Sequence, residues 1–243
     1  MSVEKRRPLE TRRHKALRRT AIFTAILALL CLLDGYRILP GHAIRYTEED
    51  YHTGRTEPVT WLVPPGELNM RTGLFCLSGS DNALLLGGVR FYPMYGWMNC
   101  GSSVMDCTSP APIHAGAWMV SRRTGRKVLD EKTQEETWQY SRAKYFFGRV
   151  DDPAVDSVRV RLCRRDYETD QYRGVTDYQI DGEAMLQRDG RRYFACPFDL
   201  DEQAFQEQYN SPAYYFCDAL DREGNVLYTQ DQEDMAVTWS SIG

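Results

Sequence analysis

Six cysteines are the residues best equipped for chemistry in this chain. They are Cys76, Cys100, Cys107, Cys163, Cys196 and Cys217. In an oxidising compartment such residues pair as disulfides. The glycine and serines that follow Cys100 favour a loop that folds back, so we predict a disulfide between Cys100 and Cys107. Thiols left unpaired are expected to be small buried hydrophobes. The C-x₂-C spacing of zinc sites is missing, and no metal is expected.

Other catalytic groups are sparse. Beyond the first 19 residues the histidines are His42, His52 and His114, and only His114 falls in a region expected to fold. The H-E-x-x-H, G-x-S-x-G, P-loop and G-x-G-x-x-G motifs are absent. Ser141 and Lys144 match the S-x-x-K pattern of penicillin-binding enzymes, but the companion motifs are missing, which favours a charged surface. The many carboxylates are interpreted as solvated. We therefore expect no catalytic residues and no cofactor.

An aromatic segment, residues 90–99 (RFYPMYGWMN), is the candidate binding site. If Tyr92, Tyr95 and Trp97 are exposed, they could stack on a sugar ring or contact a protein, because such residues dominate binding surfaces. If they are buried, they belong to the core between two sheets. Both interpretations stay open at the level of the sequence.

Short strands separated by turn residues fill most of the chain and predict a mainly β fold built as a sandwich. Glycines at 87 and 88 indicate a bulge. Arg122 to Gly125 indicates a hairpin turn, and residues 131–143 and 201–209 are expected to be helical. The predicted strands cover residues 59–63, 74–78, 83–92, 117–121, 126–130, 144–150, 157–164, 175–180, 184–187, 191–196, 213–220, 226–229 and 235–240.

The beginning of the chain is organised differently. Residues 20–33 contain no charge, glycine or proline, and eight basic residues against two acidic ones precede them. The rest of the chain carries 22 basic and 32 acidic residues. A basic segment before an apolar helix predicts that the N-terminus stays in the cytoplasm and that the body lies outside. The acidic body disfavours nucleic-acid binding.

The apolar run itself is short for a membrane span. Its 14 residues make a helix of roughly 21 Å, and extension to Leu39 admits Asp34 and Arg37 near one end. We predict a retained, single-pass transmembrane signal anchor at residues 20–39. The alternative is a signal peptide cleaved after Ala43, behind small residues, which would yield a secreted protein.

The segment SPAYYFCDALDREGNVLY (211–228) resembles the last two strands of an immunoglobulin-like sandwich. Tyr215 precedes Cys217 by two residues, as in a tyrosine corner. The resemblance is partial, because no tryptophan lies between Cys163 and Cys217. The overall plan, including YFFGRVDDPAVDSVRVRL (145–162), resembles uncharacterised signal-anchored envelope proteins of bacteria. That resemblance implies a location but no activity.

Together these features predict five regions. They are a basic cytoplasmic head (1–19), the anchor (20–39), a stalk or first short helix (40–56), a β-rich region (57–143) and an immunoglobulin-like β-sandwich (144–243). We expect a non-enzymatic, membrane-anchored extracytoplasmic protein that binds or senses an envelope protein or a glycan. The competing hypothesis is an envelope hydrolase or a thiol redox enzyme.

Overall fold

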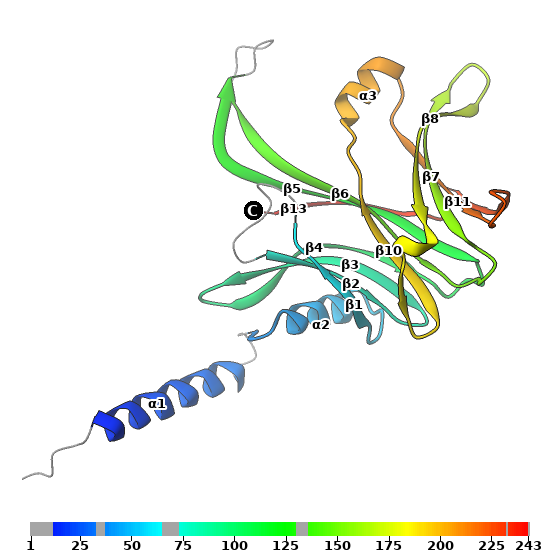
Figure 1. Cartoon of the computed structure of the whole chain (residues 1–243). Coiled ribbons are helices and arrows are strands. Elements are labelled where there is room, and N and C mark those ends of the chain that lie inside the picture. Colours follow the sequence, from blue (N-terminus) through cyan, green and yellow to red (C-terminus); the bar gives the residue numbers. More distant parts are fainter. Residues whose placement is uncertain (1–11, 33–36, 65–72, 130–135, 232, 243) are drawn as a thin grey trace, which may run out of the picture.

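The computed structural model describes residues 12–32, 37–64, 73–129, 136–231 and 233–242. The molecule is mainly β, with three sheets (Figure 1). Sheet A has the order β1-β2-β3-β4, sheet B the order β13-β5-β6-β10-β9, and sheet C the order β12-β11-β7-β8.

The bounds of the elements follow the chain. Sheet A contains β1 (Glu57–Leu62), β2 (Gly73–Gly79), β3 (Ala83–Tyr92) and β4 (Gly96–Asp106). Sheet B contains β5 (Ile113–Leu129), β6 (Glu136–Val150), β9 (Leu186–Arg188), β10 (Arg191–Pro197) and β13 (Ala236–Ile242). Sheet C contains β7 (Ser157–Asp166), β8 (Gln171–Asp181), β11 (Tyr214–Leu220) and β12 (Val226–Gln230). The helices are α1 (Arg12–Leu32), α2 (Pro40–Asp50), α3 (Glu202–Tyr209) and a short 3₁₀ turn, η2 (Gly182–Ala184).

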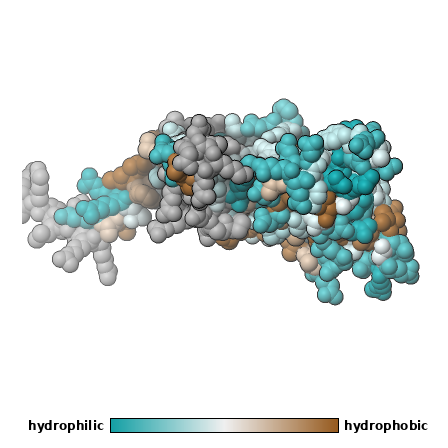
Figure 2. Space-filling view, turned by 90° about the horizontal axis from the view of Figure 1, so that it is seen from above, coloured by the Kyte–Doolittle hydropathy of each residue, from teal (hydrophilic) through white to brown (hydrophobic). Residues whose placement is uncertain are grey.

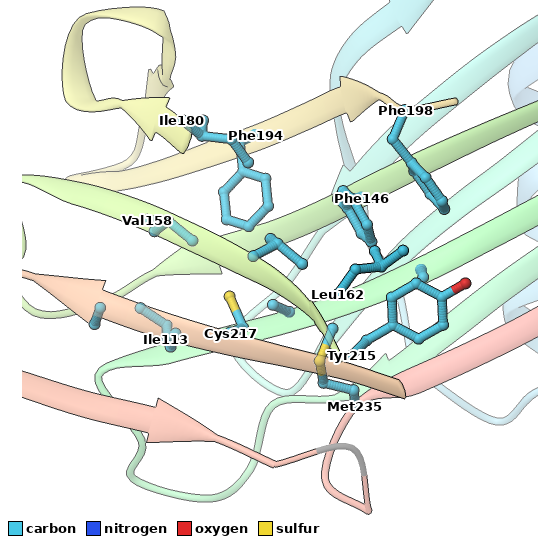
Figure 3. Packing of buried hydrophobic residues seen from close by; sticks show 14 of the residues in the cluster. Ile113, Phe146, Val158, Leu162, Ile180, Phe194, Phe198, Tyr215, Cys217 and Met235 are labelled. Carbon is cyan, nitrogen blue, oxygen red and sulfur yellow. The ribbon is translucent and has the colours of Figure 1, made fainter. Parts of the chain in front are cut away.

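Sheet B is the central layer, because both of its faces are buried. Successive side chains of a strand point to opposite faces. On β5, Ala117 and Met119 belong to the core shared with sheet C, whereas Trp118 and Val120 belong to the core shared with sheet A. The core between sheets B and C is seen closely in Figure 3, where Phe146, Phe194 and Tyr215 are among the labelled residues.

The predicted β character and the sandwich packing of sheets are confirmed. Strand β3 has the predicted bounds, and its pairing with β4 is irregular between Gly87 and Val89, at the predicted bulge. Helix α3 begins after Asp201, whose carboxylate accepts hydrogen bonds from the backbone nitrogens of Gln203 and Ala204, both at 3.1 Å.

The region around residues 117–150 differs from the prediction. The expected hairpin turn at 122–125 lies inside β5, which pairs with β6 from Ile113 opposite Val150 to Leu129 opposite Glu136. The helix predicted at 131–143 is wrong from Glu136 onwards, where β6 begins, and residues 131–135 lie outside the described residues. The predicted boundary between 143 and 144 falls within β6, so the two predicted regions share sheet B.

Of the two forms predicted for residues 40–56, a stalk or a short helix, the structure has the helix. Most of these residues form α2, which covers the face of sheet A that is turned away from sheet B (Figure 1). Ala43 and Ile44 are buried against Cys76, Leu85 and Val89 of that sheet. The apolar residues of α2 therefore belong to the folded body.

Helix α1 extends away from the sheets (Figure 1). Its apolar side chains are exposed (Figure 2). Five of its first eight residues are basic, and its uncharged part runs from Thr20 to Leu32. Among the residues that the structure describes, no helix combines the length and apolar character needed to cross a membrane. The predicted membrane span thus stays a prediction, and part of it, residues 33–36, lies outside the described residues.

Candidate functional site

The predicted aromatic segment forms the end of the β3–β4 hairpin, and we call residues 92–97 the hairpin tip. The backbone nitrogen of Tyr95 donates to the Tyr92 carbonyl at 3.1 Å, which closes a turn with Pro93 at its second position. Gly96 follows in the left-handed region, with φ at +74°, and pairs with Tyr92. The proline and the glycine thus turn the chain back on itself.

The three predicted binding residues lie in different surroundings. Tyr95 is 57% exposed and adjoins Met94, which is 80% exposed. Tyr92 is half-buried beneath the Arg90 guanidinium, 5.1 Å from the ring centre. Trp97 is half-buried and meets the Phe91 ring edge-on, with 5.8 Å between the ring centres. It also packs against the buried cluster that Ala43 and Ile44 of α2 form with sheet A. Tyr95 is therefore the tip residue with the most ring surface open to a ligand.

Arg37, which follows the end of α1 by five residues, is hydrogen-bonded to the hairpin tip. Its backbone nitrogen donates to the Tyr95 carbonyl at 3.2 Å, and its carbonyl accepts from the Trp97 nitrogen at 2.8 Å. Its guanidinium lies over the Tyr46 ring of α2, 4.5 Å from the ring centre. The chain is thus attached to the body almost directly after the apolar run.

Polar contacts fix α2 beside this attachment. Glu48 is buried, and its carboxylate accepts hydrogen bonds from the nitrogen of Thr56, at 2.8 Å, and from the Thr56 hydroxyl. The Asn99 side-chain amide of β4 donates to the Thr47 hydroxyl. The Thr56 hydroxyl is also hydrogen-bonded to the hydroxyl of Ser78 in β2, at 2.9 Å. These contacts to β2 and β4 give the helix a specific position on sheet A.

The outer face of sheet C, the face turned away from sheet B, carries a second exposed aromatic group. The Tyr172 ring meets the Tyr214 ring at 5.0 Å and the Phe216 ring at 4.9 Å, both edge-on. The Arg161 guanidinium lies over Phe216, 5.5 Å from the ring centre. Tyr172 is 46% exposed. Tyrosine and arginine in one exposed cluster have the composition of a protein-binding surface.

Two arginines of that face share one buried carboxylate. Asp218 is 1% exposed and accepts from Arg159 at 2.9 Å and from Arg161 at 2.7 Å. Burial raises the pKa of Asp218, but hydrogen bonds from Arg161, Thr229 and Arg159 outweigh it and hold the pKa below its usual value. The carboxylate therefore stays ionised and orients both guanidinium groups at the surface.

A buried polar cluster lies between sheets A and B, around Arg149. The Arg149 guanidinium donates to the Asp151 carboxylate at 2.7 Å and to the carbonyls of Asp81, at 3.1 Å, and Cys107, at 3.4 Å. Arg191 bridges Asp81 and Asp151, at 2.6 and 3.2 Å. Since the hydrogen-bonding capacity of Arg149 is used within the fold, we interpret the cluster as a support for neighbouring loops.

His114 belongs to the same cluster. It is 3% exposed, and its Nε2 lies 3.6 Å from the Asp151 carboxylate without a hydrogen-bond partner among the described residues. Burial, followed by the positive charge of Arg149, lowers the pKa of His114. The imidazole is therefore neutral at pH 7.

The predicted disulfide between Cys100 and Cys107 is not formed. The glycine and serines after Cys100 lie in the extended strand β4 instead of a loop. Seven residues of extended chain separate the two cysteines by roughly 20 Å, whereas bridged cysteines have Cα atoms within about 7 Å. Cys163 and Cys217, the other pair considered, lie on the neighbouring strands β7 and β11 of one sheet but are not opposite each other. Cys163 is opposite Tyr214, and Cys217 is opposite Val160.

All six body cysteines are free thiols in the structure. Burial raises their pKa, to about 12 for Cys76 and Cys100 and to about 11 for Cys107. A thiol with a raised pKa is a poor nucleophile at neutral pH. Among the described residues, no group of three or more histidine, cysteine or acidic side chains is arranged to hold a metal ion.

Comparisons of the chain with family models, with curated proteins and with solved structures found no match.

Proposed function

We propose that this chain is a non-enzymatic binding protein of the cell envelope, with residues 20–39 in the cell membrane and residues 1–19 in the cytoplasm. The body then lies outside the membrane. The charge distribution supports this topology, because the basic residues precede the apolar run and the acidic residues follow it.

One observation carries the proposal: the apolar side chains of α1 are exposed, while the chain directly after α1 is attached to the body. Phe23, Ile26 and Leu29 are each more than half exposed. Such a surface needs a partner, and a bilayer accommodates it. The hydroxyls of Thr20 and Thr24 donate to carbonyls one turn earlier, at 3.1 and 2.9 Å, as polar groups in hydrocarbon must.

The position of Ala43 favours a retained anchor over secretion. Cleavage after Ala43 would remove Pro40 to Ala43, the first residues of α2. Ala43 is fully buried against sheet A, and cleavage there would also remove Arg37, which joins the hairpin tip. A chain that begins at Ile44 would therefore lose contacts of its folded body.

The outer face of sheet C is the surface that we assign to the partner, a protein of the envelope. Its three rings and two arginines form one cluster that Asp218 holds in place. The β11–β12 hairpin carries the segment that resembles the end of an immunoglobulin-like sandwich, and its antiparallel pairing agrees with that resemblance. We keep the immunoglobulin-like assignment and the likeness to anchored envelope proteins as part of the proposal.

Photo-crosslinking in cells tests both halves of the proposed function. A photoreactive residue replaces Tyr172 on sheet C or, as the control, Leu186 of β9, which is similarly exposed at 42%. We expect the chain in the membrane fraction and a discrete protein adduct from position 172 but not from position 186. A chain found in the soluble fraction, or adducts that do not differ between the two positions, would contradict the proposal. An adduct with glycan instead of protein would refute the assigned partner.

A further inference from the structure

We propose that the hairpin tip and the start of α2 form a membrane-facing surface that lies in the headgroup region of the bilayer. This inference rests on the proposed function, because it requires residues 20–39 to be in the membrane. It names a bilayer as the partner of the predicted aromatic segment, in place of a protein or a sugar.

The first argument is distance along the chain. Three residues separate Leu33, the end of the apolar run, from Arg37, so the four steps between their Cα atoms span at most ~14 Å. The Arg37 backbone is hydrogen-bonded to both Tyr95 and Trp97 of the hairpin tip. The tip therefore stays within a short distance of the point where the anchor leaves the membrane.

The second argument is the exposure of apolar residues around this point. Met94 and Leu39 are 80% and 56% exposed, and Ile38, Tyr46 and Tyr95 are also exposed. Met94 and Tyr95 belong to the hairpin tip, whereas the other exposed residues lie between positions 38 and 46. Arg37 joins the two sets, because it pairs with Gly96 of the tip and its guanidinium lies over Tyr46. Tyrosines next to aliphatic side chains suit the boundary between headgroups and acyl chains.

The third argument is charge. Residues 37–47 and 90–99 contain Arg37, Arg45 and Arg90 but no aspartate or glutamate, although the chain after residue 19 has an excess of ten acidic residues. Arg45 lines a pocket that also contains Glu48 and Glu49. Arg90 pairs with Met98 and lies on the face of the hairpin opposite to Val89 and α2. Arg37 is therefore the cation that this surface offers to anionic headgroups, beside exposed apolar side chains that carry no charge.

Depth-dependent fluorescence quenching of the full-length chain tests the inference. A fluorescent amino acid is placed at position 94, at position 26 in α1, or at position 227 in β12, which is 46% exposed. Each chain is reconstituted in vesicles of phosphatidylcholine and phosphatidylglycerol. Brominated acyl chains quench probes in the bilayer, whereas iodide quenches probes in water.

We expect brominated lipid to quench the probes at 26 and 94, and iodide to quench only the probe at 227. If position 26 is quenched by lipid but position 94 responds to iodide like position 227, the membrane-facing surface is refuted while the anchor stands. If position 26 itself responds to iodide and not to lipid, the anchor of the proposed function fails first. Replacing phosphatidylglycerol by phosphatidylcholine should weaken lipid quenching at 94 more than at 26, and an equal effect would contradict the role of Arg37.

Discussion

Buried charged residues in this molecule act as internal connections. Arg149 links β6 to the loops at Asp81 and Cys107, and Asp218 links two arginines of β7 to β11. A buried charge is tolerated when its hydrogen bonds are satisfied, and removal of one partner of such a pair costs about 3–5 kcal/mol. His114 differs from both, because its Nε2 has no hydrogen-bond partner in the described part of the chain.

At the residue scale we predict that His114 makes stability depend on pH. Its pKa is lowered by burial and then by Arg149, so the folded state binds this proton less readily than the unfolded state. Stability is therefore complete above the unfolded pKa, about 6.5, and falls as the pH drops below it. Denaturant unfolding measured from about pH 7 to about pH 5 should show a shallower loss for His114→Gln than for the wild type.

The control for this prediction is His42→Gln, because His42 is exposed. Other groups around His114, namely Asp106, Asp151 and Arg149, are the same in both variants. Equal pH slopes for His114→Gln and the wild type would contradict the role of His114.

At the scale of elements, the sequence predicts the positions of the strands better than it predicts which strands pair with each other. Alternating apolar and charged residues locate β7, because burial on one face imposes a period of two, whereas a continuous apolar run locates β3, which is buried on both faces. Composition does not predict strand β4, because its glycines, asparagine and aspartate are weak strand formers, and long-range pairing with β3 overrides that weakness. The charged stretch in β6 predicts a helix, since local composition does not reveal its pairing with β5.

The candidate surfaces could be predicted only in part. The tip residues Tyr92, Tyr95 and Trp97 were found from composition, but the hydrogen bonds from Arg37 join positions nearly sixty residues apart and leave no local signal. The cluster of Tyr172, Tyr214 and Phe216 was missed for the same reason. Its rings meet only when β8 and β11 lie on either side of β7.

We predict that Gly96→Ala loosens the attachment of Arg37. A Cβ atom at position 96 would lie 2.7 Å from the Arg37 nitrogen, and the residue would also be strained at φ +74°. Trypsin should therefore cut after Arg37 faster in this variant than in the wild type. Gly224→Ala is the matched control, because φ is +85° there and no atom lies within 4 Å of the added Cβ. If the two variants are cut after Arg37 at the same rate, the attachment does not depend on Gly96.

At the scale of the whole molecule, the order of layers gives each surface one role. Helix α2 covers sheet A, sheet B is enclosed, and sheet C presents its outer face to solvent (Figure 1). Arg37, which follows α1 by five residues, is bound to the hairpin tip on the α2 side of the body. An anchored chain would thus present α2 to the membrane and leave sheet C free to meet a partner.

The central claim is that the uncharged part of α1 holds the protein in a membrane, and fractionation of two matched variants tests it most directly. Ile26→Arg places a charge in the middle of the uncharged run, where insertion would cost about 3 kcal/mol. Leu17→Arg adds the same charge to the basic part of α1, at a residue that is also exposed. We expect Leu17→Arg to stay in the membrane fraction with the wild type and Ile26→Arg to be largely lost from it. An Ile26→Arg chain as firmly retained as the wild type, or a wild type found in the soluble fraction, would contradict the account.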